Sequence, residues 1–448
     1  MFTKVLVANR GEIAVRIVRA LQELGISALV AYSEADQDTL AVQLADETIC
    51  IGPAPAMQSY LNMPAIIGAA LTRGAEAIHP GYGFLAENAT FARMVTDNGL
   101  VFIGPGAEAI ERMGDKNVAR ETMKRIGVPT VPGSDGPLNS ADEAHAYAEA
   151  VGYPVVIKAS AGGGGRGMRE VAGPEAIEDA FMAAKAEALA AFGNDEVYLE
   201  KFVVRPRHIE IQVLADTFGN AIQLGERDCS IQRRHQKLLE ESPSPAVSPE
   251  LRQRMGEAAL AAVREVEYVS AGTVEFLLGQ DGSFYFMEMN TRIQVEHPVT
   301  ELVTSTDLIK EQVRIAAGLP ISCLDKTCND MHGHAIEFRI NAEDPERGFL
   351  PNPGTITGMR LPGGPGVRLD THVYAGYTVP PTYDSLLAKL IVWGSNRDEA
   401  IARGRRALSE LSIDGIKTTI PFHRWVLEQN DFNEGEVYTD FIALHGLE

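Results

Sequence analysis

Short apolar runs alternate with amphipathic stretches over the first hundred residues. The run KVLVA at 4–8 is apolar throughout, which is typical of a strand buried on both faces of a sheet. The stretch GEIAVRIVRALQELG at 11–25 spaces its apolar residues as on one helix face and ends in glycine. SALVAYS at 27–33 completes a β-α-β unit, and residues 76–105 repeat the order of strand, turn, helix and strand. We therefore expect a doubly wound parallel α/β domain over residues 1–114.

The next segment, residues 115–203, predicts a linker followed by a small α+β module. A helix that begins near 115 runs into the Pro/Gly-rich connector GVPTVPGS. The module then contains, in order, a helix at 140–151, the strand PVVIKAS, a glycine run, the strand GMREV, a helix at 174–191 and the strand VYLEKFV.

Strand-like alternation of apolar and polar residues dominates the rest of the chain. The expected strands are HIEIQVLAD, AIQLGER, GTVEFLLG, SFYFMEMN, HAIEFRINAE and AKLIVWG. Helical spacing returns at 397–411 and 418–429. We expect residues 204–448 to form a C-terminal catalytic domain with a mixed or antiparallel sheet.

Composition and charge narrow the functional classes. The 448 residues exceed what one core supports, so more than one packed domain is expected. A net charge of −21 supplies no overall positive field, which argues against nucleic-acid and anionic-membrane binding. Four cysteines without a C-x-x-C pair favour free thiols in a reducing compartment. Since no secretory signal and no long apolar run is visible, we expect a cytoplasmic protein with no membrane partner.

The glycine run in KASAGGGGRGM, residues 158–168, matches the G-x-G-x-x-G pattern of dinucleotide-binding folds. That pattern requires a strand before it and a helix after it, whereas strands are expected on both sides here. The run therefore predicts a hairpin tip. Lys158 and Arg166 flank backbone that can approach a polyphosphate closely, which favours a phosphate-covering lid over a merely flexible surface hairpin.

A second hairpin, GTVEFLLGQDGSFYFMEMN, carries two carboxylates. A two-residue turn at Asp281-Gly282 places Glu275 opposite Glu288, with Asn290 on the same face. Facing carboxylates repel each other unless a cation lies between them. Two glutamates and an asparagine suit Mg²⁺ or Mn²⁺ bound to nucleotide phosphates. The alternatives are a solvated strand face or a different register.

Basic groups gather locally in this acidic chain. The run ERDCSIQRRHQKLLEE contains His235 and Lys237, and EMNTRIQVEHP adds Arg292 and Glu296. Arg339 lies on the polar face of HAIEFRINAE, where a structural salt bridge is the simpler interpretation. Together the cations favour capture of small anions such as phosphate and bicarbonate, and Glu296 beside them is a candidate general base.

Long collinear motifs resemble one family across essentially the whole chain. They are KVLVANRGEIAVRI, HPGYGFLAEN, GDK, IKASAGGGGRGMR, RRHQKLLEESPSP, FYFMEMNTRIQVEHPVTE and IEFRINAED. They resemble the biotin carboxylase component of biotin-dependent carboxylases, a member of the ATP-grasp superfamily. The resemblance implies an N-terminal α/β domain, a central ATP-grasp lid at 115–203, and an ATP-grasp core that ends near 317.

The same resemblance implies an ATP-dependent ligase in which ATP phosphorylates bicarbonate and the carboxyphosphate carboxylates biotin. It implies ATP contacts at Lys116, Lys158, Gly164, Gly165, Glu200, Lys201, Phe202, Val203, His208, His235, Glu275 and Glu288. It implies a metal, Mg²⁺ or Mn²⁺, on Glu275, Glu288 and Asn290. It implies bicarbonate on Lys237, Arg292, Gln294, the Val295 backbone and Glu296. It implies biotin near Tyr82 and Arg339, and catalytic roles for Arg292, Glu296, Arg339 and Lys237.

Partners follow from the resemblance and from one missing motif. Because the M-K-M of a biotin-carrying domain is absent and the chain ends at Glu448, we expect a separate subunit of an acetyl-CoA carboxylase in fatty acid synthesis. Its expected partners are a biotin carboxyl carrier protein, carboxyltransferase subunits and a second copy in a homodimer. Departures from the family pattern are Ala161, Val203 and one extra residue in the metal hairpin. The alternatives are another ATP-grasp carboxylate or amine ligase and a non-catalytic nucleotide-sensing subunit.

Overall fold

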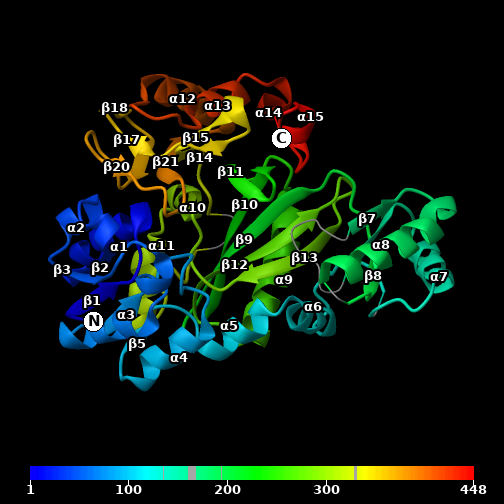
Figure 1. The fold of residues 1–448 in the computed structure, drawn as a ribbon, viewed down its shortest axis with the longest axis horizontal. Coiled ribbons are helices and arrows are strands. Elements are labelled where there is room, and N and C mark those ends of the chain that lie inside the picture. Colours follow the sequence, from blue (N-terminus) through cyan, green and yellow to red (C-terminus); the bar gives the residue numbers. More distant parts are fainter. Residues whose placement is uncertain (135, 160–167, 193, 327–329, 448) are drawn as a thin grey trace. The chain divides into compact units, whose positions relative to one another are not determined.

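The structure is a computed structural model that describes residues 1–134, 136–159, 168–192, 194–326 and 330–447 (Figure 1). The chain divides into two units. Unit 1 consists of Met1–Ile126, Arg207–Phe276 and Met287–Glu448, and unit 2 consists of Gly127–Pro206 and Leu277–Phe286. No helix among the described residues is long and apolar enough to cross a membrane.

The N-terminal apolar runs form a parallel sheet within unit 1, as predicted. Its strand order is β3 (Glu47–Gly52), β2 (Ser27–Ser33), β1 (Lys4–Val7), β4 (Ala77–His79) and β5 (Val101–Phe102). The helices of this region are α1 (Gly11–Glu23), α2 (Leu40–Leu44), α3 (Met63–Thr72), α4 (Ala89–Asp97), α5 (Ala107–Gly114) and α6 (Lys116–Arg125). Val5 packs in the core cluster that includes α1, while Leu6 packs in the cluster that includes α3 and α4. Helices therefore cover both faces of the sheet, and its central strands are apolar on both faces.

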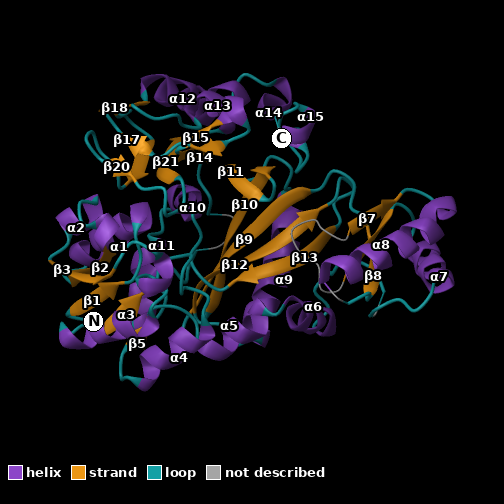
Figure 2. Cartoon of the chain, in the orientation of Figure 1, coloured by secondary structure: helices purple, strands orange, loops and turns teal. Residues whose placement is uncertain are grey.

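A large sheet carries most of the remaining strands of unit 1. Its order is β13 (Phe284–Asn290), β12 (Ser270–Leu278), β9 (Arg207–Ala215), β10 (Ala221–Arg233), β11 (Gln236–Ser242), β14 (His334–Asn341), β21 (Leu386–Gly394) and β19 (Val367–Thr371). From β9 to β19, each neighbouring pair is antiparallel, which confirms the expected sheet type. Helix α9 (Pro249–Glu265) packs on β9 and β10, and α12 (Arg397–Glu410) packs on β14 and β21 (Figure 2).

Shorter elements complete unit 1. The remaining helices are α10 (His297–Thr304), α11 (Leu308–Ala316), α13 (Ile420–Val426), α14 (Asn430–Glu434) and α15 (Phe441–Leu444). Two-stranded ladders pair β15 (Glu343–Asp344) with β16 (Leu350–Pro351), β17 (Gly354–Thr355) with β20 (Thr378–Val379), and β18 (Gly358–Arg360) with β22 (Ser412–Asp414). The predicted helix at 418–429 is shorter than expected, because Pro421 at its start and the turn after Val426 limit it.

The glycine run of unit 2 connects two antiparallel strands, so the rejection of a dinucleotide-binding turn is confirmed. Strand β6 (Val155–Ala159) pairs with β7 (Met168–Val171) on one side and with β8 (Val197–Lys201) on the other. Helices α7 (Ala141–Val151) and α8 (Ile177–Phe192) pack against this sheet. The glycines themselves, including Gly164 and Gly165, lie outside the described residues.

The predicted turn of the carboxylate hairpin is wrong. The Gly279 N–H donates to the Ser283 carbonyl at 2.8 Å, and the Gly282 N–H donates to the Gly279 carbonyl at 3.1 Å. Gly282 has a φ of +77°, so a three-residue loop with a left-handed glycine replaces the two-residue turn. The pairing next to the loop is therefore offset by one residue, and the argument that placed Glu275 directly opposite Glu288 no longer holds.

Glu241 ties together three elements in the C-terminal part of unit 1. Its carboxylate lies 2.7 Å from His334 Nε2 on β14 and accepts hydrogen bonds from Arg397 Nε and Nη2 on α12, at 2.7 and 3.2 Å. Burial alone would raise the pKa of Glu241, but Arg397 and His334 lower it to about 2. Ionised Glu241 thus stabilises the folded state at neutral pH.

We expect Glu241→Gln to lower the apparent free energy of unfolding by about 3 kcal/mol at neutral pH. The folded pKa lies below the ordinary value near 4.5, so this contribution is complete above that value and is lost as the pH falls toward 2. The difference between variant and wild type should therefore shrink on acidification. Urea titrations followed by the fluorescence of Trp393 and Trp425 measure it, with exposed Glu428→Gln as control. A pH-independent difference would contradict the assignment.

Candidate active site

Lys237 lies at the centre of a buried charge cluster in unit 1. Its ammonium donates to Glu210 Oε2 at 2.6 Å, to Glu275 Oε1 at 2.9 Å and to Glu296 Oε1 at 2.7 Å. Burial by itself lowers the pKa of Lys237, but the three carboxylates outweigh it and raise the pKa well above its ordinary value. Lys237 is consequently a permanent cation, and the predicted grouping of Lys237 with Glu296 is present in the structure.

The Glu275 carboxylate accepts hydrogen bonds from residues of several elements. Its Oε1 accepts hydrogen bonds from Asn290 Nδ2 at 2.8 Å and from Gln294 Nε2 at 2.7 Å, in addition to Lys237. Its Oε2 lies 2.8 Å from His208 Nε2. Burial would raise the pKa of Glu275, but Lys237 and then His208 lower it well below its ordinary value. Glu275 is therefore an ionised carboxylate.

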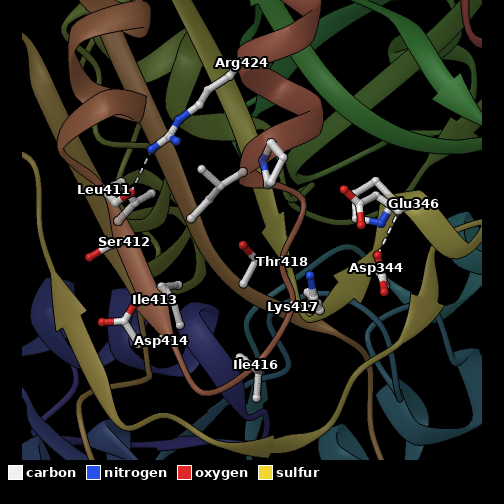
Figure 3. A pocket seen from close by; sticks show the side chains of 13 residues that line it. Asp344, Glu346, Leu411, Ser412, Ile413, Asp414, Ile416, Lys417, Thr418 and Arg424 are labelled. Atoms are coloured by element: carbon white, nitrogen blue, oxygen red, sulfur yellow. Dashed lines mark hydrogen bonds between the residues drawn. The ribbon is translucent and has the colours of Figure 1, made fainter.

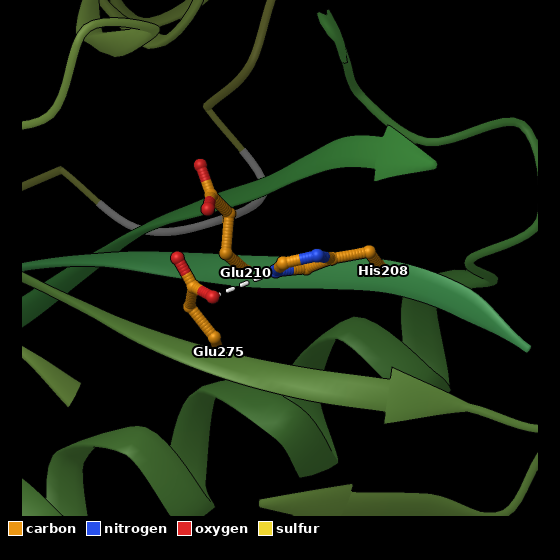
Figure 4. Close-up of side chains that lie close together, drawn as sticks. All are labelled: His208, Glu210 and Glu275. Carbon is orange, nitrogen blue, oxygen red and sulfur yellow. Dashed lines mark hydrogen bonds and ion pairs between the residues drawn. The ribbon is translucent and has the colours of Figure 1, made fainter. Parts of the chain in front are cut away.

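Figure 4 shows how strand geometry builds this end of the cluster: His208 and Glu210 extend from the same strand, β9, toward Glu275 on the neighbouring strand β12. All three side chains are buried, and the one candidate ligand atom that each offers lies within 4.8 Å of the other two. Residues two apart on a strand share a face, so β9 presents both side chains to the same space.

Arg227 on β10 is a completely buried residue that the sequence showed only as part of a charge run. Its guanidinium donates to Glu210 Oε1 at 2.5 Å, Gln212 Oε1 at 2.7 Å, Thr300 Oγ1 at 3.0 Å, Thr273 Oγ1 at 3.2 Å and Gln294 Oε1 at 2.6 Å. The fixed fork of an arginine orients all of its acceptors. Arg227 thereby holds Glu210 and Gln294 in the positions from which they meet Lys237 and Glu275.

Arg339 and Glu296 form the other end of the cluster. Arg339 Nη2 donates to Glu296 Oε2 at 2.9 Å, and Arg339 Nε donates to Glu240 Oε1 at 2.6 Å. Burial would raise the pKa of Glu296, but Lys237 and Arg339 lower it despite the opposing charge of Glu210. Glu296 is therefore ionised and lies between two cations, which is the protonation state that the predicted role of general base requires.

Arg292 is held at the surface of the cluster. Its Nε donates to Glu87 Oε2 at 2.8 Å, and its Nη2 donates to Asn290 Oδ1 at 2.8 Å. Glu87 also accepts from the Thr291 backbone N–H at 3.0 Å. Asn290 therefore links Arg292 to Glu275 through the two ends of its amide.

Tyr82 and Val295 are connected through two residues that the sequence did not indicate. The Tyr82 hydroxyl donates to Glu12 on α1, and the other oxygen of Glu12 lies 3.1 Å from Lys389 Nζ. Lys389 on β21 is buried and donates to the Val295 carbonyl at 2.8 Å. The Val295 carbonyl, just before α10, is thus held by a buried lysine that Glu12 also contacts.

Two residues predicted to contact ATP, Lys116 and Glu288, have exposed side chains and form an ion pair with each other. Lys116 begins α6 with 80% of its side chain exposed, and its Nζ lies 3.1 Å from Glu288 Oε2 on β13, a side chain that is 38% exposed. His235 is exposed in the turn between β10 and β11. The structure does not bring His235 into the Lys237 cluster.

The predicted metal ligands have chemistry that fits a hard divalent cation. Glu275 and Glu288 supply carboxylate oxygens, and Asn290 supplies an amide oxygen. Glu275 is ionised but already contacts the Lys237 ammonium and the His208 imidazole, so a cation bound there would have to replace part of these contacts. Asn290 would have to exchange its contact with Arg292 to present its oxygen.

The predicted residues of unit 2 form a separate set. Lys158 Nζ on β6 donates to Glu200 Oε2 on β8 at 2.5 Å, because these strands are adjacent and antiparallel. Lys201 Nζ donates to the carbonyls of Gly152 and Tyr153, at 2.9 Å each. Phe202 and Val203 follow β8 and are half-buried.

Glu210, Arg227, Glu240 and Lys389 are site residues that sequence reasoning missed. Each is a charged residue in a strand whose other residues are largely buried, as in HIEIQVLAD, where His208, Glu210 and Gln212 alternate with aliphatic residues. A charge on a strand buried on both faces needs partners across the sheet. The alternation of charged and aliphatic residues thus indicates that these charges have partners. It does not identify the partners, because they depend on strand order.

A pocket of about 240 Å³ lies elsewhere in unit 1, between β15, β22 and α13 (Figure 3). None of the residues predicted from the sequence lines it. Arg424 at its wall donates to the Leu408 and Leu411 carbonyls, and Asp344 accepts from the Glu346 N–H. Arg424 and Asp344 are thus engaged in local structure.

Three family models match consecutive parts of the chain. Residues 1–110 match the N-terminal domain of biotin carboxylase, residues 115–324 match the ATP-binding domain of the carbamoyl-phosphate synthase L chain, and residues 337–444 match the C-terminal domain of biotin carboxylase. The three matches follow one another along the chain and together span most of it.

Relatives of known identity align over nearly their whole length. A biotin carboxylase from Nostoc sp. is 58% identical over 441 residues, which is 98% of each chain. The biotin carboxylase–β,γ-ATP complex from Campylobacter jejuni superposes with a TM-score of 0.90 at 48% identity, covering 99% of each chain. The biotin carboxylase domain dimer of Hydrogenobacter thermophilus 2-oxoglutarate carboxylase, in complex with MgADP, ADP and bicarbonate, superposes with a TM-score of 0.88 at 50% identity, covering 100% of this chain and 98% of that one. The chain belongs to the biotin carboxylase family of ATP-dependent ligases.

Proposed function

We propose that this chain carboxylates biotin on a biotin carboxyl carrier protein, using ATP and bicarbonate by way of carboxyphosphate. The observation that carries the proposal is the buried carboxylate of Glu296, held between the cations of Lys237 and Arg339. A base beside fixed cations is what deprotonation of an anionic acid such as bicarbonate requires.

Bicarbonate activation is assigned to the Lys237 side of this arrangement. Glu296 is ionised at neutral pH because Lys237 and Arg339 outweigh its burial, so it can accept the bicarbonate proton. Lys237, Arg292, Gln294 and the Val295 backbone N–H would hold the anion. The deprotonated oxygen then attacks the γ-phosphorus of ATP, ADP leaves, and the positive charges offset the charge that develops in this step.

Two sets of residues are the proposed ATP contacts. In unit 1 the ATP-contacting residues would be Lys116, His208, His235, Glu275 and Glu288, and in unit 2 they would be Lys158, Gly164, Gly165, Glu200, Lys201, Phe202 and Val203. When bound to Glu275, Glu288 and Asn290, Mg²⁺ or Mn²⁺ would neutralise phosphate charge. The lysines among these proposed contacts would add positive charge from the protein. The glycine hairpin would exclude water from the reactive carboxyphosphate.

Biotin carboxylation is assigned to the Arg339 side. Carboxyphosphate breaks down to CO₂ and phosphate, the phosphate removes the proton of biotin N1′, and N1′ then attacks CO₂. Arg339 would stabilise the enolate oxygen that forms on the ureido ring, with Tyr82 beside the ring. Contacts from Tyr82 to Glu12, from Glu12 to Lys389 and from Lys389 to the Val295 carbonyl connect Tyr82 with the backbone that is proposed to hold bicarbonate.

The remaining parts of the proposal concern partners and location. We propose carboxyltransferase subunits as further partners, acetyl-CoA as the final acceptor, a homodimer as the assembly and the cytoplasm as the location. A dimer is named for the Hydrogenobacter thermophilus domain, and the described cysteines Cys50, Cys229 and Cys323 are unpaired, as a reducing compartment favours. That domain belongs to a 2-oxoglutarate carboxylase, so copurification of the carboxyltransferase is the measurement that identifies the acceptor.

The function is tested by ADP release with Mg²⁺, bicarbonate and free biotin. We expect ADP release to depend on bicarbonate and to increase on addition of biotin, with carboxybiotin as a product. Another ATP-grasp ligase would require a different acceptor, and a nucleotide-sensing subunit would release no ADP. Bicarbonate-dependent ATP cleavage that biotin does not stimulate would contradict the proposal.

Arg339→Ala should separate the biotin step from nucleotide binding. We expect kcat/KM for biotin to fall by about a hundredfold or more, because one preorganised donor to a developing oxyanion is lost. The dissociation constant for ATP should stay within about threefold of wild type, since Arg339 contacts glutamates and no proposed nucleotide ligand. The exposed Arg360→Ala is the matched control. Weakened ATP affinity with unchanged biotin kinetics would reverse the assignment.

Glu288→Gln should raise the Mg²⁺ concentration needed for half-maximal activity by about tenfold or more, because a charged ligand becomes neutral. Steady-state rates over a Mg²⁺ series at saturating ATP measure the change. Glu257→Gln on the exposed face of α9 is the control and should leave the series unchanged. An unaltered Mg²⁺ dependence would remove Glu288 from the metal site.

A further inference from the structure

Glu337 is a buried acid whose carboxyl oxygens have no hydrogen-bond partner among the described residues. It lies on β14, two residues before Arg339 and therefore on the same face of the sheet, and its exposed fraction is 0%. No ion pair to Glu337 occurs within 4 Å among the described residues. An isolated buried carboxylate is strongly disfavoured, so this group requires a proton or a partner.

Glu240 stands directly opposite Glu337. The antiparallel register of β11 and β14 pairs these two residues, and directly paired side chains begin about 5 Å apart at Cβ. Glu240 Oε1 accepts from Arg339 Nε, whereas Glu240 Oε2 has no partner among the described residues. Unpaired carboxyl oxygens thus occur on both members of one cross-strand pair.

We propose that Glu337 is a neutral acid that shares its proton with Glu240, and that this pair is the positioning device for Arg339. One proton on Glu337 donated to Glu240 Oε2 satisfies both side chains and leaves Glu240 with one net negative charge for Arg339. Glu337 thus acts through Glu240 on Arg339, so its role is positioning. The inference rests on the proposed function, because it concerns how Arg339 is presented to biotin.

The surrounding charges support this distribution of the proton. Glu337 faces Glu240 on β11, Arg339 on its own strand, Lys389 on β21 and Glu296 before α10. Lys389 is already engaged by Glu12 and the Val295 carbonyl. Burial raises the pKa of Glu337 well above its ordinary value, with Lys389 opposing and Glu240 adding to the rise. Burial also raises the pKa of Glu240, to about 7, although Arg339 lowers it.

Two variants separate the proton of Glu337 from its volume. Glu337→Gln keeps a donor for Glu240 but cannot ionise, whereas Glu337→Leu removes the donor. We expect kcat/KM for biotin to fall by roughly tenfold or more in Glu337→Leu and to stay within about threefold of wild type in Glu337→Gln. The KM for ATP should be unchanged in both.

The pH profile provides a readout that a merely structural role would not alter. Above the pH at which the shared proton leaves, both carboxylates are charged, they repel each other, and Arg339 is held by an additional negative charge. The wild-type kcat/KM for biotin should therefore fall at alkaline pH, and Glu337→Gln should lose that fall.

Infrared difference spectroscopy tests the proton directly and without turnover. We expect a protonated-carboxyl band in the wild type at neutral pH that is absent in Glu337→Gln. Identical bands and identical pH profiles in these two proteins would overturn the proposal, as would wild-type biotin kinetics in a folded Glu337→Leu. If the wild type shows no biotin-stimulated ADP release, the proposed function fails, while the infrared band still decides whether Glu337 holds a proton.

Discussion

The ammonium of Lys237, bonded to three buried carboxylates, is the interaction on which the site depends. Each of these charges would be unfavourable in the interior without its partners, and together they compensate one another. The compensation is possible only if β9, β11 and β12 keep their order in the sheet, with β10 carrying Arg227 between β9 and β11. The pairing of these charges therefore requires the observed strand order and register, because a strand shifted by one residue would bury unpaired charge.

The same electrostatics bears on the anion binding that is proposed for this site. In unit 1, Lys116 pairs with Glu288, and Arg292 pairs with Glu87. Lys116 and Arg292 retain partial exposure, so water screens their ion pairs and exchange for a substrate anion costs little. Lys237 and Arg339 lie deeper and keep fixed positions. Exposed cations that can exchange partners suit the capture of an anion. Deeper cations with fixed positions suit the stabilisation of charge that develops during a reaction.

Local patterns predicted the parts of the fold that depend on neighbours in sequence. The apolar runs of the N-terminal sheet and the hairpin around the glycine run were correct, because burial on both faces and flanking strands are visible locally. The turn at Asp281-Gly282 was wrong because the same dipeptide serves a two-residue turn and a three-residue loop, and only the pairing at Gly279 distinguishes them. Arg227 was only one residue of the basic run ERDCSIQRRHQKLLEE in the sequence, because its acceptors come from elements up to 73 residues away.

Strand order also separates the two halves of the proposed reaction across one face of the sheet. The proposed ATP contacts Glu275 and His208 lie on β12 and β9, whereas Arg339, proposed to act on biotin, lies on β14 and Lys389 on the adjacent β21. Lys237 on β11 contacts Glu296, and Glu296 contacts Arg339, so the base belongs to both sides. A proton taken by Glu296 would weaken its hold on both cations at once. In the proposed reaction, this one carboxylate would therefore link the activation of bicarbonate to the strength of the ion pair that holds Arg339.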